Sequence, residues 1–91
     1  MASGWYVYLI ECTDGSLYTG VAVDVARRYA QHASGKGARY TRAHPPKRLA
    51  AMIGFGSRSA ACVAEYQIKQ LGTAAKRELC RLHAVAEDCE P

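Results

Sequence analysis

The chain has 91 residues, which is enough for one compact domain and too few for two. Hydrophobic residues make up 49% of it and charged residues 22%, a balance that excludes an intrinsically disordered protein. The net charge is +4, the longest apolar run is far shorter than a membrane span, and the start MASGWY lacks the plan of a signal peptide. We therefore expect one cytoplasmic domain over residues 1–91, with its core at about 4–83 and no membrane association.

Residues 5–12 alternate between two sets of side chains, and both sets are apolar or aromatic. The two sets point to opposite faces of a strand: Trp5, Val7 and Leu9 on one, Tyr6, Tyr8 and Ile10 on the other. Such a strand is expected to be covered on both sides. Asp14-Gly15 is a turn signal, and residues 17–23 resume a β-rich run, so the sequence predicts a hairpin.

The segment VARRYAQHA at residues 25–33 is predicted to form a helix. Asp24 is a good N-cap for it, and Gly35 follows its end. At about 100° per residue, Val25 and Tyr29 fall on one stripe, which we expect to face the core.

A loop and a third strand are predicted next. The loop covers residues 35–47, GKGARYTRAHPPK, with glycines at its front and Pro45-Pro46 near its end. Residues 49–55 read as a strand, although Gly54 weakens the pattern.

A second helix is predicted after this strand, from Ser57 or Ser59 to Leu71, with Gly72 closing it. Glu65 lies about a quarter-turn away from the expected core face, at the boundary with water. That core face consists of Ala60, Ala64, Ile68 and Leu71.

The last predicted helix runs from a cap at Thr73 to about His83, and residues 84–91 are expected to be a frayed tail. The chain has four cysteines whose spacing fits neither a CxxC pair nor a zinc pattern. We expect all four to be reduced thiols, with Cys12 and Cys62 in or near the core.

Two tyrosine-containing triplets lie at opposite ends of the predicted hairpin. Tyr6-Val7-Tyr8 is in the first strand and Tyr18-Thr19-Gly20 in the second. Arg28 and His32 follow on the first helix, four residues apart beside its buried stripe, and Glu65 follows on the second helix. In this order and spacing, the five elements resemble the GIY-YIG nuclease signature, and the chain most resembles the small stand-alone, single-domain members of that superfamily.

The resemblance implies an α+β fold, a small three-stranded antiparallel sheet flanked by helices, in agreement with the predicted order β-β-α-β-α-α. It also implies hydrolysis of a phosphodiester bond with one divalent cation, Mg²⁺ or Mn²⁺, held by Glu65. The catalytic residues that carry over are Tyr8, Tyr18, Arg28, His32 and Glu65.

These residue types also suit the chemistry on general grounds. A lone carboxylate such as Glu65 can hold Mg²⁺ or Mn²⁺ that keeps most of its waters, and the guanidinium of Arg28 suits a phosphate. Tyrosine is a weak base at its free pKa of about 10, but nearby cations favour the phenolate. Tyr8 or Tyr18 can then orient or deprotonate the attacking water, and His32 can relay the proton or hold a tyrosine.

Each of these residues also has a structural alternative. Glu65 can form an ion pair with Lys69, four residues further along the helix. Tyr8 and Tyr18 can be half-buried strand residues, and His32 can lie at the edge of the core.

The middle of the chain is basic and free of carboxylates. Residues 25–64 contain eight lysines and arginines and no aspartate or glutamate, as a surface that binds a polyanion requires. The loop GKGARYTR adds an aromatic ring, Tyr40, to its cations, a combination that fits phosphate contact and base stacking. We expect nucleic-acid contacts from Tyr6, Arg27, Lys36, Arg39, Tyr40, Arg42, Lys47 and Arg58.

These observations favour a metal-dependent endonuclease that acts on DNA, single-stranded or branched, with RNA as the second candidate substrate. The alternative is a non-catalytic nucleic-acid-binding module with the same fold, and a protein-interaction adaptor is a more remote one. Glu65 separates the first two, because a pure binder gains nothing from an anion that faces phosphate. The sequence leaves the identity of the metal, and the choice between monomer and weak dimer, open.

Overall fold

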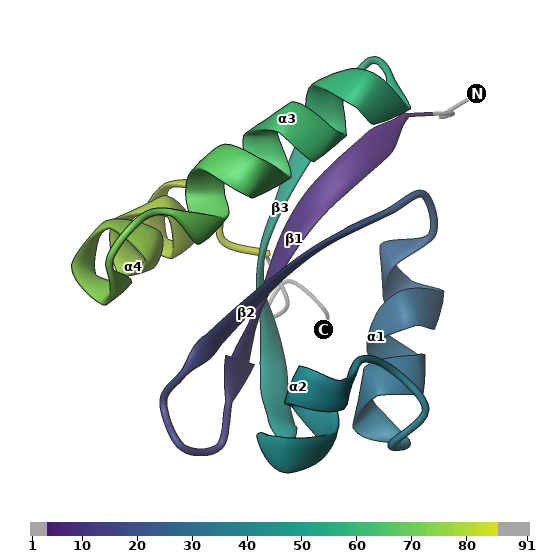
Figure 1. Ribbon diagram of the computed structural model, residues 1–91, viewed down its shortest axis with the longest axis vertical. Coiled ribbons are helices and arrows are strands. Elements are labelled where there is room, and N and C mark those ends of the chain that lie inside the picture. Colours follow the sequence, from purple (N-terminus) through teal and green to yellow (C-terminus); the bar gives the residue numbers. More distant parts are fainter. Residues whose placement is uncertain (1–3, 86–91) are drawn as a thin grey trace, which may run out of the picture.

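The computed structural model describes residues 4–85 and has an α+β fold in the predicted order, with one additional short helix. One antiparallel sheet has the strand order β2-β1-β3, so β1 is central. Helices α3 and α4 lie on one side of the sheet and α1 and α2 on the other (Figure 1). The elements are β1 Trp5–Cys12, β2 Leu17–Ala22, α1 Val25–Ala33, α2 Arg39–Ala43, β3 Pro46–Phe55, α3 Arg58–Lys69 and α4 Thr73–Leu82. Most of the expected tail, residues 86–91, lies outside the described residues.

The central strand β1 is buried on both faces, as its sequence predicts. Val7 and Leu9 pack with residues of α3 in one core cluster. Tyr8 and Ile10 pack with Val25 of α1 in a second cluster on the other face. The sheet therefore separates two cores, and a side chain of β1 belongs to one or the other according to the parity of its position.

The hairpin between β1 and β2 is confirmed, with Tyr8 paired to Gly20 across the two strands. In the turn, the carboxylate of Asp14 accepts hydrogen bonds from the backbone N–H and the hydroxyl of Ser16, at 3.1 and 2.7 Å. Gly15 has φ +87°, a left-handed conformation that glycine adopts without strain.

The predicted loop over residues 35–47 is in part a helix, and this is a correction. Arg39–Ala43 forms α2, one short helical turn that packs beside α1. The third strand also begins at Pro46, earlier than residue 49, and ends at Phe55 as predicted. Proline is tolerated there because it stands first in an edge strand, where the sheet does not require its missing N–H.

The N-terminal cap of α3 is Ser57, whose hydroxyl accepts a hydrogen bond from the N–H of Ala60 at 3.1 Å. The C-terminus differs from the prediction, because the helix ends at Lys69. Gly72 does not close it: with φ −75° and ψ 171°, it is the N-cap residue of α4, and Thr73 is the first residue of that helix.

The buried face of α3 is also shifted relative to the prediction. Ala61 and Ile68 are buried, whereas Ala60 and Leu71 are exposed. The shift follows from the boundaries of the helix: Leu71 lies beyond its end, so the helical phase no longer places this side chain over the sheet. Ala64 belongs to the predicted face and also to the observed one: it is half-buried and packs against the core.

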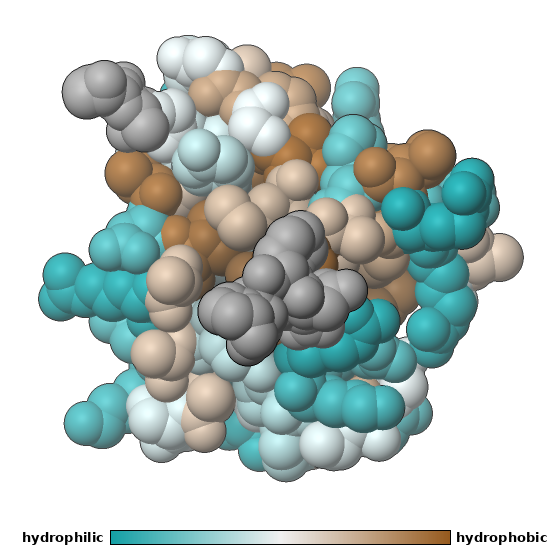
Figure 2. Space-filling model, turned by 180° about the vertical axis from the view of Figure 1, so that it is seen from behind, coloured by the Kyte–Doolittle hydropathy of each residue, from teal (hydrophilic) through white to brown (hydrophobic). Residues whose placement is uncertain are grey.

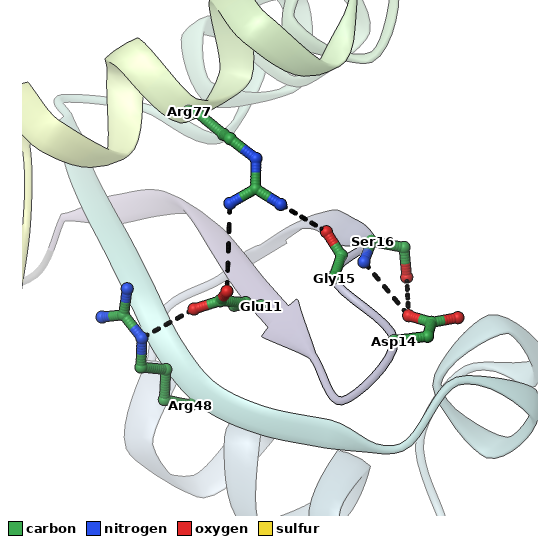
Figure 3. A network of polar contacts seen from close by, with 6 residues as sticks. All are labelled: Glu11, Asp14, Gly15, Ser16, Arg48 and Arg77. Atoms are coloured by element: carbon green, nitrogen blue, oxygen red, sulfur yellow. Dashed lines mark hydrogen bonds and ion pairs between the residues drawn. The ribbon is translucent and has the colours of Figure 1, made fainter.

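Helix α4 lies at the surface of the molecule, and none of its residues is fully buried. The guanidinium of Arg77 donates to the carbonyl of Gly15 at 2.7 Å and lies 3.9 Å from the carboxylate of Glu11 (Figure 3). The same carboxylate accepts a hydrogen bond from Arg48 at 2.8 Å. Both arginines line a cavity of about 330 Å³ beside α4. The contacts of Arg77, together with the packing of Leu79 and Cys80 against the core, hold the helix in place.

On the side of the molecule opposite to the view of Figure 1, hydrophilic residues gather at the margins, and apolar side chains reach the surface between them (Figure 2). Within residues 4–85, no helix is both long and apolar enough to cross a membrane. In the same range Cys12 is a buried free thiol, but Cys62 is exposed, contrary to the prediction; Cys89 lies outside the described residues.

Candidate active site

Four of the five predicted catalytic side chains line one cavity of about 410 Å³: Tyr8, Tyr18, Arg28 and Glu65. They come from β1, β2, α1 and α3, so the cavity receives residues from helices on both sides of the sheet. It is further lined by Trp5, Gly20, Val21, Arg58 and Cys62.

The fifth residue, His32, lies behind Tyr8 and is buried. The hydroxyl of Tyr8 is 2.9 Å from Nε2 of His32, and Nδ1 of His32 is 2.7 Å from the hydroxyl of Thr41. Thr41 donates its single hydroxyl proton to the carbonyl of Ala38 at 3.0 Å. The N–H of Ala38 also points to Nδ1 of His32, but at 3.4 Å this contact is long, and the 2.7 Å bond to Thr41 is the stronger one. Thr41 therefore accepts from Nδ1–H, which leaves Nε2 as the acceptor for the proton of Tyr8.

Burial determines the protonation of this pair. It lowers the pKa of His32, and the nearby charge of Arg28 lowers it further, so the imidazole is neutral at neutral pH. It also raises the pKa of Tyr8 to about 12, with a contribution from Tyr18, and this exceeds the opposing effect of Arg28. Arg28 does favour the phenolate of Tyr8, as expected of a cation, but desolvation outweighs this effect and the phenol stays protonated in the protein alone.

Gly20, the last residue of the second triplet, is required by the packing of Tyr8. A Cβ at this position would lie 2.5 Å from the Tyr8 hydroxyl oxygen and 3.1 Å from Cε2 of Tyr18. The phenol of the buried Tyr8 thus passes directly over Gly20, its partner across the hairpin, and both residues form part of the cavity wall.

Two residues that place His32 were not identified from the sequence. Thr41 is buried in α2, and a Cβ on Gly37 would lie 2.8 Å from Cγ of His32 and closer still to its Nδ1. Both residues stand in the stretch GKGARYTR, where glycine and threonine are ordinary loop residues. For Thr41, the only signal in the sequence is a hydroxyl within ten residues of His32, and such a possible hydrogen-bonding partner is too common to be singled out. For Gly37 the sequence gives no signal.

Tyr18 belongs to a group of stacked rings. Its ring centroid is 5.0 Å from that of His32 and 6.4 Å from that of Tyr8. On the side of α2, Tyr40 stacks with Tyr18 at 5.7 Å and with His44 at 4.3 Å. Tyr18 itself is half-buried and lines the cavity.

Arg28 and Arg27 occupy different sides of α1, as their spacing predicts. Arg28 is half-buried, lines the cavity and donates to the side-chain carbonyl of Gln31 at 2.8 Å. Arg27 is exposed. A guanidinium fixed at the wall of a cavity is suited to a phosphate that enters it.

Glu65 has its predicted partner, since Nζ of Lys69 lies 3.1 Å from its carboxylate. Its side chain is 24% exposed and therefore accessible from the cavity. In the described part of the chain, no group of three His, Cys, Asp or Glu side chains is placed to hold a metal ion. One carboxylate beside open, hydrated space fits Mg²⁺ or Mn²⁺, which take one or two protein carboxylates and complete their shells with water and phosphate oxygens.

The residues expected to contact nucleic acid differ in how far their side chains are exposed. Arg58 is exposed, lines the cavity and lies 5.7 Å from the centre of the Trp5 ring, a cation–π contact. Tyr6 is half-buried and packs in the cluster beneath α1. Tyr40 is 37% exposed. The remaining expected residues are exposed: Arg27, Lys36, Arg39, Arg42 and Lys47.

The chain is similar to a set of small proteins. A UPF0213 protein of Cupriavidus necator is 51% identical over 78 residues, which cover 86% of this chain and 85% of that protein. The solution NMR structure of the UPF0213 protein BH0048 from Bacillus halodurans superimposes with a TM-score of 0.58 at 46% identity and covers 93% of this chain and 90% of its own. That of the protein EF2693 from E. faecalis gives 0.60 at 34% identity, with 87% and 84% covered. Because the GIY-YIG catalytic domain matches residues 4–78, the chain belongs to the GIY-YIG family, which is a nuclease superfamily.

Proposed function

We propose that the protein is a divalent-metal-dependent endonuclease that hydrolyses phosphodiester bonds in DNA. The observation that carries the proposal is the single cavity lined by Tyr8, Tyr18, Arg28 and Glu65. Hydrolysis of a phosphodiester needs a positioned water, an acceptor for its proton and positive charge on the phosphorane-like transition state. These side chains offer each of the three.

In this mechanism Arg28 binds a non-bridging oxygen of the scissile phosphate and stabilises the charge that develops there. Glu65 would hold the divalent cation, which would supply further positive charge to the phosphate and lower the pKa of a bound water. Tyr18, at the wall of the cavity, orients the attacking water.

The proton of that water passes along the buried pair. As the water oxygen bonds to phosphorus, its proton moves to the hydroxyl oxygen of Tyr8, and the proton of Tyr8 moves to Nε2 of His32, 2.9 Å away. His32 becomes an imidazolium whose Nδ1–H still donates to Thr41. The bond from phosphorus to the leaving oxygen breaks, and this oxygen takes a proton from solvent. Tyr8 thus needs no free phenolate, in keeping with its raised pKa.

For the substrate, we propose single-stranded or branched DNA, with RNA as the second candidate. Three exposed cations lie in α2 or just before it and can bind the phosphates of a short DNA strand: Lys36, Arg39 and Arg42. The exposed edge of Tyr40 lies among them and can contact an unpaired base.

The second candidate function, a nucleic-acid-binding module without catalysis, is favoured by the ion pair between Glu65 and Lys69. In that case the carboxylate has only a helical partner and no metal.

The substitution Glu65→Gln distinguishes the two candidates. Purified protein is incubated with labelled single-stranded, duplex and branched DNA in Mg²⁺, Mn²⁺ or EDTA. We expect cleavage that EDTA abolishes and that Glu65→Gln reduces at least about a hundredfold, or roughly 2.7 kcal/mol of barrier, with DNA binding retained. Glu78→Gln, at an exposed glutamate of α4, is the matched control. Cleavage that persists in EDTA, or an unimpaired Glu65→Gln, contradicts the proposal.

A further inference from the structure

Tyr40 is held by two aromatic contacts. Its ring stacks with that of Tyr18 at a centroid distance of 5.7 Å and an interplanar angle of 30°. It also stacks with His44 at 4.3 Å and 23°. His44 is the C-cap residue of α2, four positions after Tyr40, so the short helix itself brings the two rings together.

His44 is fixed in turn by the hairpin between β1 and β2. Its Nδ1 lies 2.5 Å from a carboxylate oxygen of Asp14, and the other oxygen of Asp14 accepts the bonds from Ser16 that shape the turn (Figure 3). Both sets of bonds hold the pKa of Asp14 well below its usual range, so the carboxylate is charged under working conditions. The contacts therefore run from the turn through His44 and Tyr40 to Tyr18.

The orientation of the Tyr18 side chain depends on the rings that pack against it. Within residues 4–85 its hydroxyl makes no hydrogen bond, so ring packing determines where the hydroxyl points. The hydroxyl stands at the far end of a rigid ring, and a small rotation displaces it by about 1 Å. A misplacement of about 1 Å is enough to lower the rate of a reaction about a hundredfold.

We propose that Asp14, His44 and Tyr40 together direct the hydroxyl of Tyr18 into the cavity. We call this set of three residues the brace. Its three members are positioning residues: they act through Tyr18 and do not touch the reacting atoms. The proposal rests on the nuclease function proposed above. It adds a role in catalytic geometry to the base contact proposed for the exposed edge of Tyr40. The two roles separate in kinetics, because loss of a base contact raises KM and loss of the brace lowers kcat.

The kinetic test uses Tyr40→Leu, Tyr40→Phe and His44→Leu, with His83→Leu as the matched control. His83 is also an exposed C-cap histidine, at the end of α4. On single-stranded DNA with Mn²⁺, we expect Tyr40→Leu and His44→Leu to lower kcat about tenfold or more, and His44→Leu to leave KM within about twofold. Tyr40→Phe keeps the stacking ring, so it should recover most of the kcat that Tyr40→Leu loses. His83→Leu should retain the wild-type kcat. A loss confined to KM, or an equal loss in Tyr40→Phe, overturns the brace.

An independent readout does not require activity. In protein labelled with ¹³C in its tyrosine rings, His44→Leu should shift the NMR resonances of Tyr18, although His44 does not contact that ring directly, and leave those of the exposed Tyr66 on α3 in place. Unmoved Tyr18 resonances overturn the brace whether or not DNA is cleaved. Absence of cleavage by the wild-type protein, with Tyr18 shifted in the variant, contradicts the nuclease function and not the brace. His44→Leu also serves if Tyr40→Leu does not fold, which circular dichroism establishes.

Discussion

At the scale of single residues, Tyr8 has two environments along the length of its side chain. Its ring is packed in the core cluster beneath α1 and passes over Gly20, while its hydroxyl is bonded to His32 at the wall of the cavity. Packing and hydrogen bonding can therefore be separated by removing the hydroxyl alone.

We expect Tyr8→Phe to lower the rate of DNA cleavage at least about a hundredfold, because the proton of the attacking water loses its first acceptor. It should also destabilise the protein by about 1–3 kcal/mol, since Nε2 of buried His32 is left without its donor. Single-turnover rates and urea unfolding measure the two effects. Tyr6→Phe, on the same face of β1, is the control. If the two variants cleave equally well, Tyr8 is a core residue and no more.

His32 makes stability depend on pH in a defined direction. Its folded pKa lies below the value of about 6.5 for an unfolded chain. As the pH falls below about 6.5, the unfolded chain binds a proton that the folded protein resists, so the free energy of unfolding decreases. We expect wild-type protein to lose more stability between about pH 7.5 and pH 5 than His32→Gln, which cannot be protonated. Urea midpoints at several pH values test this; the same loss in both proteins would assign the effect to other groups.

At the scale of elements, α2 connects the loop after α1 to the site. The neighbouring residues Tyr40 and Thr41 contact Tyr18 and His32 respectively, so a helix of five residues touches both. Gly37 precedes it and leaves the space in which the imidazole lies. The loop therefore has a structural requirement in addition to its basic charge.

We expect Gly37→Ala to displace the imidazole of His32, because the added methyl group overlaps that ring. Cleavage should fall about tenfold or more, and the overpacking should cost about 1–3 kcal/mol of stability. Gly56→Ala is the matched control, since a Cβ there meets no atom within 4 Å. The NMR titration of His32 reports the displacement directly. Wild-type cleavage and an unchanged His32 resonance in Gly37→Ala would show that the ring has room to move.

At the scale of the whole molecule, the basic and carboxylate-free segment from 25 to 64 contributes α1, α2, β3 and the start of α3. Two of its cations line the cavity, Arg28 from α1 and Arg58 from α3. We expect this surface to contact a few nucleotides of one strand.

If this surface neutralises about four phosphates of a single strand, the logarithm of the binding constant should fall with the logarithm of salt concentration at a slope of about −0.7 × 4, or about −3. Arg39→Ala should flatten the slope by somewhat less than one unit, because one phosphate contact is lost. Titrations at several salt concentrations, with single-stranded and blunt duplex DNA, measure both. Tighter binding to the duplex, or a slope that Arg39→Ala leaves unchanged, contradicts the substrate proposal.

The sequence by itself determined the features that rest on local chemistry. The alternation of residues 5–12, the turn at Asp14-Gly15 and the cap at Asp24 predicted the hairpin and α1, and the structure confirms them. The two triplets with Arg28 and Glu65 predicted the family. The hairpin and helix signals each lie within a few residues, where strand parity, turn geometry and capping act without help from the rest of the chain. The family signature is a series of such short motifs whose order along the chain can be seen without the fold.

Only the tertiary structure decided the rest. Helix α2 is too short to be stable alone, so it depends on its contacts with α1 and with Tyr18, which no local pattern encodes. The same applies to the bond between His32 and Thr41, to the space at Gly37 and to the brace, since their partners come from separate elements. The raised pKa of Tyr8 likewise follows from burial, and burial is a property of the whole fold.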